Sequence, residues 1–156
     1  MYFHDLSFYS YFVKKPLADV RNVGWLDANH SYPKGLCSPD ICEIVHALLY
    51  DKVPGVYAHV NPIRGSHPCN LCKESESLSD AELELVIGSS EIWIPSAEGI
   101  FASPSMILHY MSHHNYFPPN EFLAAVMSVR LLDKFNGQDE FEIRNSAATA
   151  GEKGAE

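Results

Sequence analysis

Residues 91–114 read EIWIPSAEGIFASPSMILHYMSHH, and this stretch decides how the chain folds. Glu91–Ile94 and Gly99–Ala102 are rich in β-branched and aromatic residues, and the four residues between them supply a turn. We therefore expect an antiparallel hairpin. Ser103 and Pro104 favour a helix start directly after it, because serine caps helices and proline suits their first position. This predicted helix carries the histidines.

The predicted helix presents two imidazoles to one metal ion. His109 and His113 are four residues apart, so they project from the same face. Upstream, Cys69 and Cys72 form a C-x-x-C step whose thiols can converge from a tight turn. Two thiolates and two imidazoles are typical ligands of structural zinc. The sequence thus predicts a zinc-knuckle-like Cys2His2 site, although its two halves are further apart than the roughly 12–15 residues of a simple finger.

Two other histidines are alternative ligands. His114 adjoins His113, but five residues rotate it about 140° around a helix from His109, which makes it the poorer choice by geometry. His67 lies close to the cysteine pair and could bind the metal or orient another ligand. Neither is excluded by the sequence.

The C-x-x-C step has other interpretations. The two thiols could be buried and reduced, or they could form a redox pair, although such pairs usually begin a helix after a strand. Pro68-Cys69-Asn70-Leu71-Cys72 also matches half of the zinc deaminase signature. That chemistry needs an upstream H-x-E or C-x-E element, which the chain lacks. A structural metal site therefore explains the pattern best.

An enzyme is the alternative function. A pocket near the cysteine pair could use Arg64, Asp27 and Glu91 together with His67 and His114. Arg64 could hold a carboxylate or phosphate with two hydrogen bonds. The simpler interpretations are a surface ion pair for Arg64, a turn for Asp27 and an outward strand position for Glu91. No metalloprotease, nucleophile-elbow, phosphate-loop or dinucleotide signature occurs.

The remaining pattern predicts an α+β fold, a small antiparallel sheet with about three helices. Ser38-Pro39-Asp40 begins one helix, and Ile41, Ile44, Val45, Leu48 and Leu49 follow its buried face. Another helix begins at Pro119-Asn120-Glu121. Leu83–Ile87 resembles a further strand. We expect a single domain over residues 1–135 and a disordered tail over 136–156, where Gly, Ala, Ser and Glu dominate.

The net charge of the chain limits the kind of macromolecule that it can bind. The chain has 11 basic and 20 acidic residues and a net charge of −9. This argues against general nucleic-acid binding, which needs a Lys/Arg surface, and is compatible with a basic protein partner. No secretory signal or membrane-spanning stretch is visible, so we expect a cytoplasmic protein. The predicted function is a zinc-stabilised protein-binding module, with an immunity or antitoxin-like protein as one version.

Four elements together resemble a known family. They are GWLD at Gly24–Asp27, RGSHPCNLC at Arg64–Cys72 and GSSEI at Gly88–Ile92. The fourth element spans Ala102–Phe122 and consists of an A-x-P segment followed by HY, a second histidine and Y-x-P-P. The chain resembles an uncharacterised family of small bacterial proteins, a domain of unknown function, over roughly residues 2–128. The resemblance implies no activity. In its pattern the second histidine stands two residues before Tyr116, which is His114, whereas helical geometry favours His113.

Overall fold

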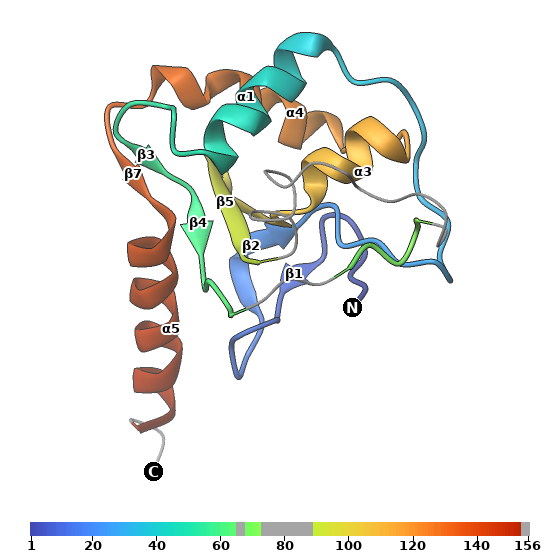
Figure 1. The fold of residues 1–156 in the computed structure, drawn as a ribbon. Coiled ribbons are helices and arrows are strands. Elements are labelled where there is room, and N and C mark those ends of the chain that lie inside the picture. The colour runs from blue at the N-terminus through green and yellow to red at the C-terminus, as the bar shows by residue number, and fades with distance from the viewer. Residues whose placement is uncertain (65–67, 73–88, 154–156) are drawn as a thin grey trace.

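The computed structural model describes residues 1–64, 68–72 and 89–153, and it has an α+β architecture (Figure 1). Two groups of strands and four α-helices make up the described part of the chain. In chain order the elements are β1 Phe8–Tyr9, β2 Leu17–Asn22, α1 Pro39–Leu49, β3 Val56–Tyr57, β4 His59–Val60, β5 Glu91–Ser96, β6 Gly99–Pro104, α3 Ile107–His113, α4 Asn120–Ser128, the 3-10 turn η1 Val129–Leu131, β7 Phe135–Asn136 and α5 Gly137–Lys153. The predicted strand at Leu83–Ile87 lies outside the described residues.

The main sheet is mixed, which corrects the prediction of an antiparallel sheet. Its strand order is β1-β2-β6-β5-β4. The predicted hairpin is present as β5 and β6, but β2 pairs with β6 in parallel. The two hairpin strands are antiparallel because a short turn connects them, whereas the connection between β2 and β6 contains most of the domain. A long connection leaves either direction open, so local sequence signals could not decide it. A second, two-stranded sheet pairs β3 with β7.

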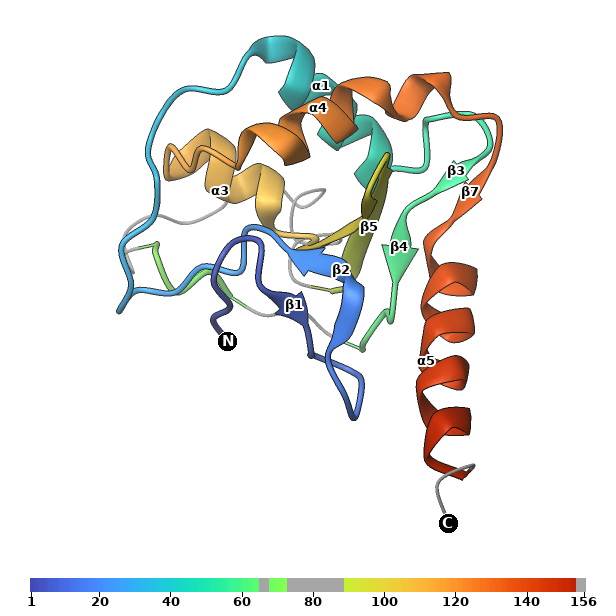
Figure 2. The ribbon, with the colours of Figure 1, turned by 180° about the vertical axis from the view of Figure 1, so that it is seen from behind.

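Helix α1 forms as its apolar spacing predicts, and α4 begins where its predicted start lies. Ser38 caps α1 by accepting a hydrogen bond from the backbone N–H of Ile41, and all five predicted face residues of α1 are buried. In α4, Phe122, Ala125 and Val126 are buried likewise. The three helices α1, α3 and α4 lie together on one side of the main sheet (Figures 1 and 2).

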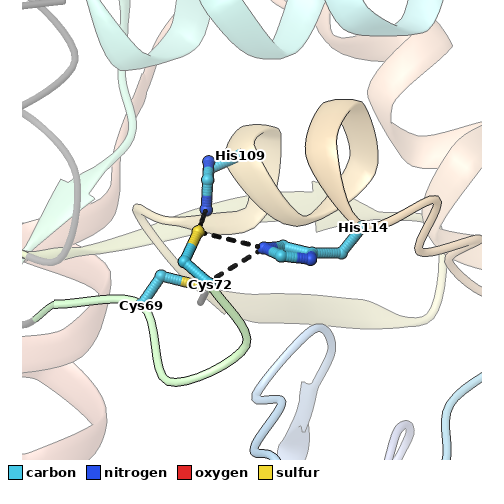
Figure 3. A group of neighbouring side chains, drawn as sticks. All are labelled: Cys69, Cys72, His109 and His114. Carbon is cyan, nitrogen blue, oxygen red and sulfur yellow. Dashed lines mark hydrogen bonds between the residues drawn. The ribbon is translucent and has the colours of Figure 1, made fainter. Parts of the chain in front are cut away.

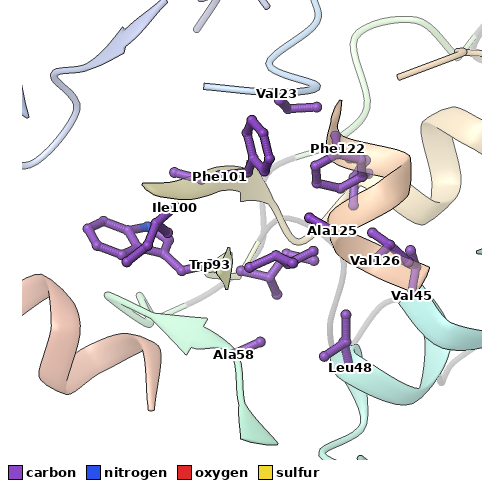
Figure 4. Close-up of a cluster of buried hydrophobic side chains, with 14 of the residues drawn as sticks. Val23, Val45, Leu48, Ala58, Trp93, Ile100, Phe101, Phe122, Ala125 and Val126 are labelled. Atoms are coloured by element: carbon purple, nitrogen blue, oxygen red, sulfur yellow. The ribbon is translucent and has the colours of Figure 1, made fainter. Parts of the chain in front are cut away.

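The hydrophobic core lies between these helices and the hairpin. Ile92, Trp93 and Ile94 of β5 have no exposed surface. Phe101 of β6 meets Phe122 of α4 edge to face, with ring centroids 5.9 Å apart. Figure 4 shows these rings with aliphatic side chains from α1 and α4. Burial of this kind gains about 25 cal/mol for each Å² of apolar surface, so the hairpin is held mainly by packing.

Helix α3 begins later than predicted. Ser103 and Pro104 belong to β6, where they pair with Ile92 and Glu91 of β5. The backbone N–H of Ser105 then donates to the carbonyl of Ser90. Because the ladder uses these backbone groups, the helix cannot start until Ile107. His109 therefore lies in the first turn of a short helix.

The predicted disordered tail is replaced by helix α5. Asn136 accepts a hydrogen bond from the backbone N–H of Asp139, which is the pattern of an N-terminal helix cap. Phe141 is buried and contacts Trp93 edge to face at 5.7 Å. Arg144 pairs with Asp19 of β2. The sequence of this segment suggests disorder because only one large apolar side chain in the first turns of α5 reaches the core. Figure 2 shows α5 lying beside β4 and extending past the sheet.

Candidate metal centre

The cysteine turn, residues 68–72, supplies two sulfur atoms. It forms a turn at Asn70 and Leu71 and contains no strand or helix residue. Cys69, Leu71 and Cys72 are half-buried, and Cys69 and Leu71 pack against the hydrophobic core. The tight turn brings both thiols to the same side, toward α3.

His109 supplies the first imidazole. It is 1% exposed, and its Nε2 lies 3.2 Å from Sγ of Cys72. Burial, followed by the neighbouring His113 and His114, lowers the pKa of His109 to about 4. The ring is consequently neutral at pH 7, which is the form that coordinates metals. Its Nδ1 is buried and has no hydrogen-bond partner among the described residues.

His114 supplies the second imidazole, from the turn that ends α3. Its backbone N–H donates to the carbonyl of Tyr110, and its own carbonyl accepts from the hydroxyl of Tyr32. The next residue, Asn115, has φ +53°, a left-handed conformation that asparagine tolerates better than most residues. This turn leads the chain away from the helix, and the His114 ring just before it points toward the cysteines (Figure 3).

Two backbone links hold that turn in place. The carbonyl of Asn115 accepts from the N–H of Gly35, and the N–H of Phe117 donates to the carbonyl of Pro33. Tyr116 is buried, and its hydroxyl donates to the carboxylate of Asp5. The position of His114 is therefore fixed from two distant parts of the chain, residues 32–35 and Asp5.

The four donor atoms are close enough to share one metal ion (Figure 3). One atom from each of Cys69, Cys72, His109 and His114 lies within 4.8 Å of the other three. Nε2 of His114 lies 3.5 Å from Sγ of Cys69 and 3.4 Å from Sγ of Cys72. Tetrahedral zinc with Zn–S of about 2.3 Å and Zn–N of about 2.0–2.1 Å separates sulfur from nitrogen by about 3.5 Å. We call these four residues the Cys–His cluster.

The structure places His114, rather than His113, in the cluster. Helix α3 ends at His113, so the rule of four-residue spacing no longer applies to the next residue. His113 is exposed, and its Nδ1 lies 3.2 Å from the hydroxyl of Ser112. The position of His114 agrees with the histidine that the family resemblance implies. His67, the other alternative, lies outside the described residues.

The three predicted pocket residues do not come together. Glu91 is buried in β5 and lines a cavity of about 330 Å³. Arg64 is exposed, and neither it nor Asp27 is among the residues that line this cavity. Asp27 instead accepts from the N–H of Asn29 and contacts His30, which lowers the pKa of its carboxyl. Asp27 therefore has the turn-forming role that its sequence context favours.

The cavity adjoins the Cys–His cluster. Pro68 and Asn70, on either side of Cys69, line it together with Tyr110, the neighbour of His109. Burial raises the pKa of Tyr110 above its ordinary value, and the charges of the two cysteines and of Asp27 raise it more. The sequence patterns did not predict that Tyr11, Phe12 and Trp25 line this cavity, because they lie in the N-terminal segment far from the cysteine and histidine motifs.

Comparison with known proteins identifies a family but no function. A family model described as "Domain of unknown function (DUF7919)" matches residues 1–127, which include the whole Cys–His cluster. The search of curated proteins and the search of solved structures gave no significant match. No helix in the described part of the chain is long and apolar enough to cross a membrane.

Proposed function

Since the chain belongs to the family described as Domain of unknown function (DUF7919), we propose its role from its own residues: a structural zinc centre that ties the cysteine turn to the end of α3. The observation that carries this proposal is the approach of four Cys and His donor atoms to within 4.8 Å of one another. They come from two segments that share no strand pairing.

The donor types favour zinc over other metals. Two thiolates with two neutral imidazoles are typical of tetrahedral zinc, whereas calcium and magnesium prefer oxygen ligands. Four protein ligands complete the tetrahedron, which leaves no open position for a water or substrate. This arrangement supports a structural role for the metal over a catalytic one.

The cysteine turn is the part that most needs the metal. Residues 68–72 have no backbone ladder, and Cys69 and Cys72 are only half-buried. Two sulfur–metal bonds would fix this turn against α3. Because an ordered metal site rarely survives in an unfolded chain, the binding free energy becomes folding free energy.

Protein binding is the function that we propose for the assembled domain. The net charge of −9 supports a basic protein partner, because opposite fields speed and orient association. An immunity or antitoxin-like protein is one concrete version. A co-purification experiment with zinc-loaded protein at low and moderate salt tests this, and recovery of no specific basic protein at either salt concentration counts against it.

The metal itself is tested by its content in purified protein. We expect about one zinc per chain by inductively coupled plasma mass spectrometry, and loss of that zinc in Cys69→Ser. Cys42→Ser is the matched control, because Cys42 is also half-buried but lies in α1 outside the cluster. Absence of metal from folded wild-type protein, or equal zinc in wild type and Cys69→Ser, would refute the proposal.

Cobalt gives an independent measure of the donor set. A Co²⁺-loaded chain with two thiolate ligands is expected to show the visible absorption of tetrahedral cobalt together with sulfur-to-metal charge transfer. The charge-transfer band should weaken in Cys69→Ser and stay unchanged in Cys42→Ser. An octahedral spectrum would contradict the four-ligand arrangement.

A further inference from the structure

The cavity beside the metal centre has a composition that the zinc proposal does not explain. Its volume of about 330 Å³ is in the range of small-molecule sites. The walls are mostly apolar and aromatic, and one buried carboxylate, that of Glu91, lies among them. Among the described residues that line the cavity, no other side chain carries a formal charge.

The Glu91 carboxylate is held by neutral groups. The Tyr9 hydroxyl and the Asn61 amide donate to Oε2 at 2.9 and 3.0 Å, and the Trp93 indole N–H donates to Oε1 at 3.2 Å. None of these donors carries a positive charge, and Glu91 forms no ion pair with a described residue. A buried carboxylate of this kind has its geometry fixed but its charge uncompensated.

Aromatic rings stand around the same cavity. Tyr11 contacts Phe12 with ring centroids 4.0 Å apart and Trp25 at 5.3 Å, and all three residues line the cavity. The Trp25 ring is fixed because its N–H donates to the carbonyl of Ala102. The faces of such rings attract cations, most strongly where water is excluded.

We propose that this cavity binds the primary ammonium group of a small organic amine, with Glu91 as its counter-ion and Tyr11, Phe12 and Trp25 around it. Oε1 of Glu91 accepts only one hydrogen bond from the described residues, so it can accept another from an ammonium N–H. The apolar lining from Leu26, Ile63 and Met106 suits the hydrocarbon part of the ligand.

The protonation behaviour of Glu91 supports this assignment. Burial raises the pKa of Glu91 to about 7, because removal from water disfavours the charged form more than its three hydrogen bonds favour it. The pKa of the Tyr11 hydroxyl is raised by burial and, as a smaller effect, by the negative charge of Glu91. A bound cation would offset the cost of the buried charge, which no described side chain does.

The test compares a charged probe with a neutral one of the same size. Zinc-loaded full-length protein is titrated with n-butylammonium and, separately, with butan-1-ol, followed by calorimetry and by Trp fluorescence. We expect wild type to bind the ammonium about tenfold more tightly than the alcohol. Equal affinity for the two probes, or no binding of the ammonium, would overturn the proposal.

Variants assign the preference to the named residues. Glu91→Gln keeps the side-chain shape and is expected to reduce the ammonium-to-alcohol preference to about one. Phe12→Leu removes an aromatic ring from the cavity, and because Phe12 is 43% exposed the variant should still fold. We expect its affinity for the ammonium to fall several-fold and its affinity for the alcohol to stay unchanged. Phe8→Leu is the control, because Phe8 is a similarly exposed ring that does not line the cavity.

Zinc content and melting temperature are measured for each variant, which separates this proposal from the metal centre. If Glu91→Gln fails to fold, Phe12→Leu against Phe8→Leu decides the outcome. A preference that neither Glu91→Gln nor Phe12→Leu alters would show that the ammonium binds elsewhere, and the proposal would be wrong.

Discussion

The cysteine turn and the β5–β6 hairpin are held in place by different forces. The hairpin pairs residue by residue from Glu91 to Ser96, and three of its β5 side chains have no exposed surface. The cysteine turn has no strand partner, and both of its cysteines are half-buried. One region is stable through apolar burial, whereas the other, under the proposed metal centre, is held by four donor atoms that meet at one point. Perturbations should therefore affect the two regions unequally.

Removing the metal should have the largest effect. Treatment with a strong chelator, or the Cys72→Ser substitution, is expected to lower stability by several kcal/mol and the melting temperature by about 10 °C or more. Amide hydrogen exchange should accelerate at the cysteine turn and α3 while the β5–β6 amides stay protected. Uniform loss of protection, or an unchanged melting temperature, would show that the two regions do not differ in this way.

Helix α5 tests the packing side of the comparison. Phe141→Ala removes a buried ring that contacts Trp93 and Tyr9, and it should cost about 3 kcal/mol, at the low end for a buried phenylalanine. Ile143→Ala on the same helix is the control, since Ile143 is 62% exposed and should change stability by less than about 0.5 kcal/mol. Chemical denaturation measures both. Equal effects would mean that α5 does not dock through Phe141.

Glu91 gives the hairpin a pH dependence. Its carboxyl has an ordinary pKa of 4.5 and a folded-state pKa of about 7, so the folded protein holds the proton more tightly. The corresponding stability is fully present below about pH 4.5 and is lost as the pH rises through about 7. The advantage of wild type over Glu91→Gln should shrink by up to roughly 3 kcal/mol between pH 5 and pH 8. A constant difference would show that Glu91 stays ionised.

The smallest effect is expected at His113. His113→Gln should bind zinc as wild type does and change stability by less than about 0.5 kcal/mol, because this side chain is exposed. His114→Gln should lose the metal. Metal content and melting temperature of the two variants separate the neighbouring histidines, and the reverse result would restore His113 as the ligand.

Local signals predicted the elements that local forces build. The cap at Ser38 and the apolar spacing of α1 needed nothing beyond the helix itself, and the β5–β6 hairpin needed only its short turn. The parallel pairing of β2 with β6 depends on where distant segments dock, so no local pattern could show it. Helix α5 was missed although Asn136, Asp139 and Glu140 form a helix-start signal, because its composition suggested disorder.

The cluster was predicted in part for a similar reason. The C-x-x-C step and His109 are recognisable from ligand chemistry alone. The choice between His113 and His114 depends on where α3 ends, and that end is set by contacts with residues 32–35 and with Asp5. The cavity needs a complete tertiary structure, since it joins Tyr11 and Trp25 to Glu91 and Tyr110.

The position of β6 inside the sheet constrains the order of events during synthesis. Strands β1, β2 and β4 all emerge from the ribosome before β6, yet β2 gains its inner partner only from β6. Until about two thirds of the chain has been made, the early strands have exposed edges and their apolar residues have no core. The cysteines likewise precede both histidines of the Cys–His cluster, so under the proposed metal centre thiolates are the first ligands available to an incoming ion. Assembly of this domain is therefore a late event, and the proposed metal centre requires that its cysteines stay reduced and unmodified until both histidines have been translated.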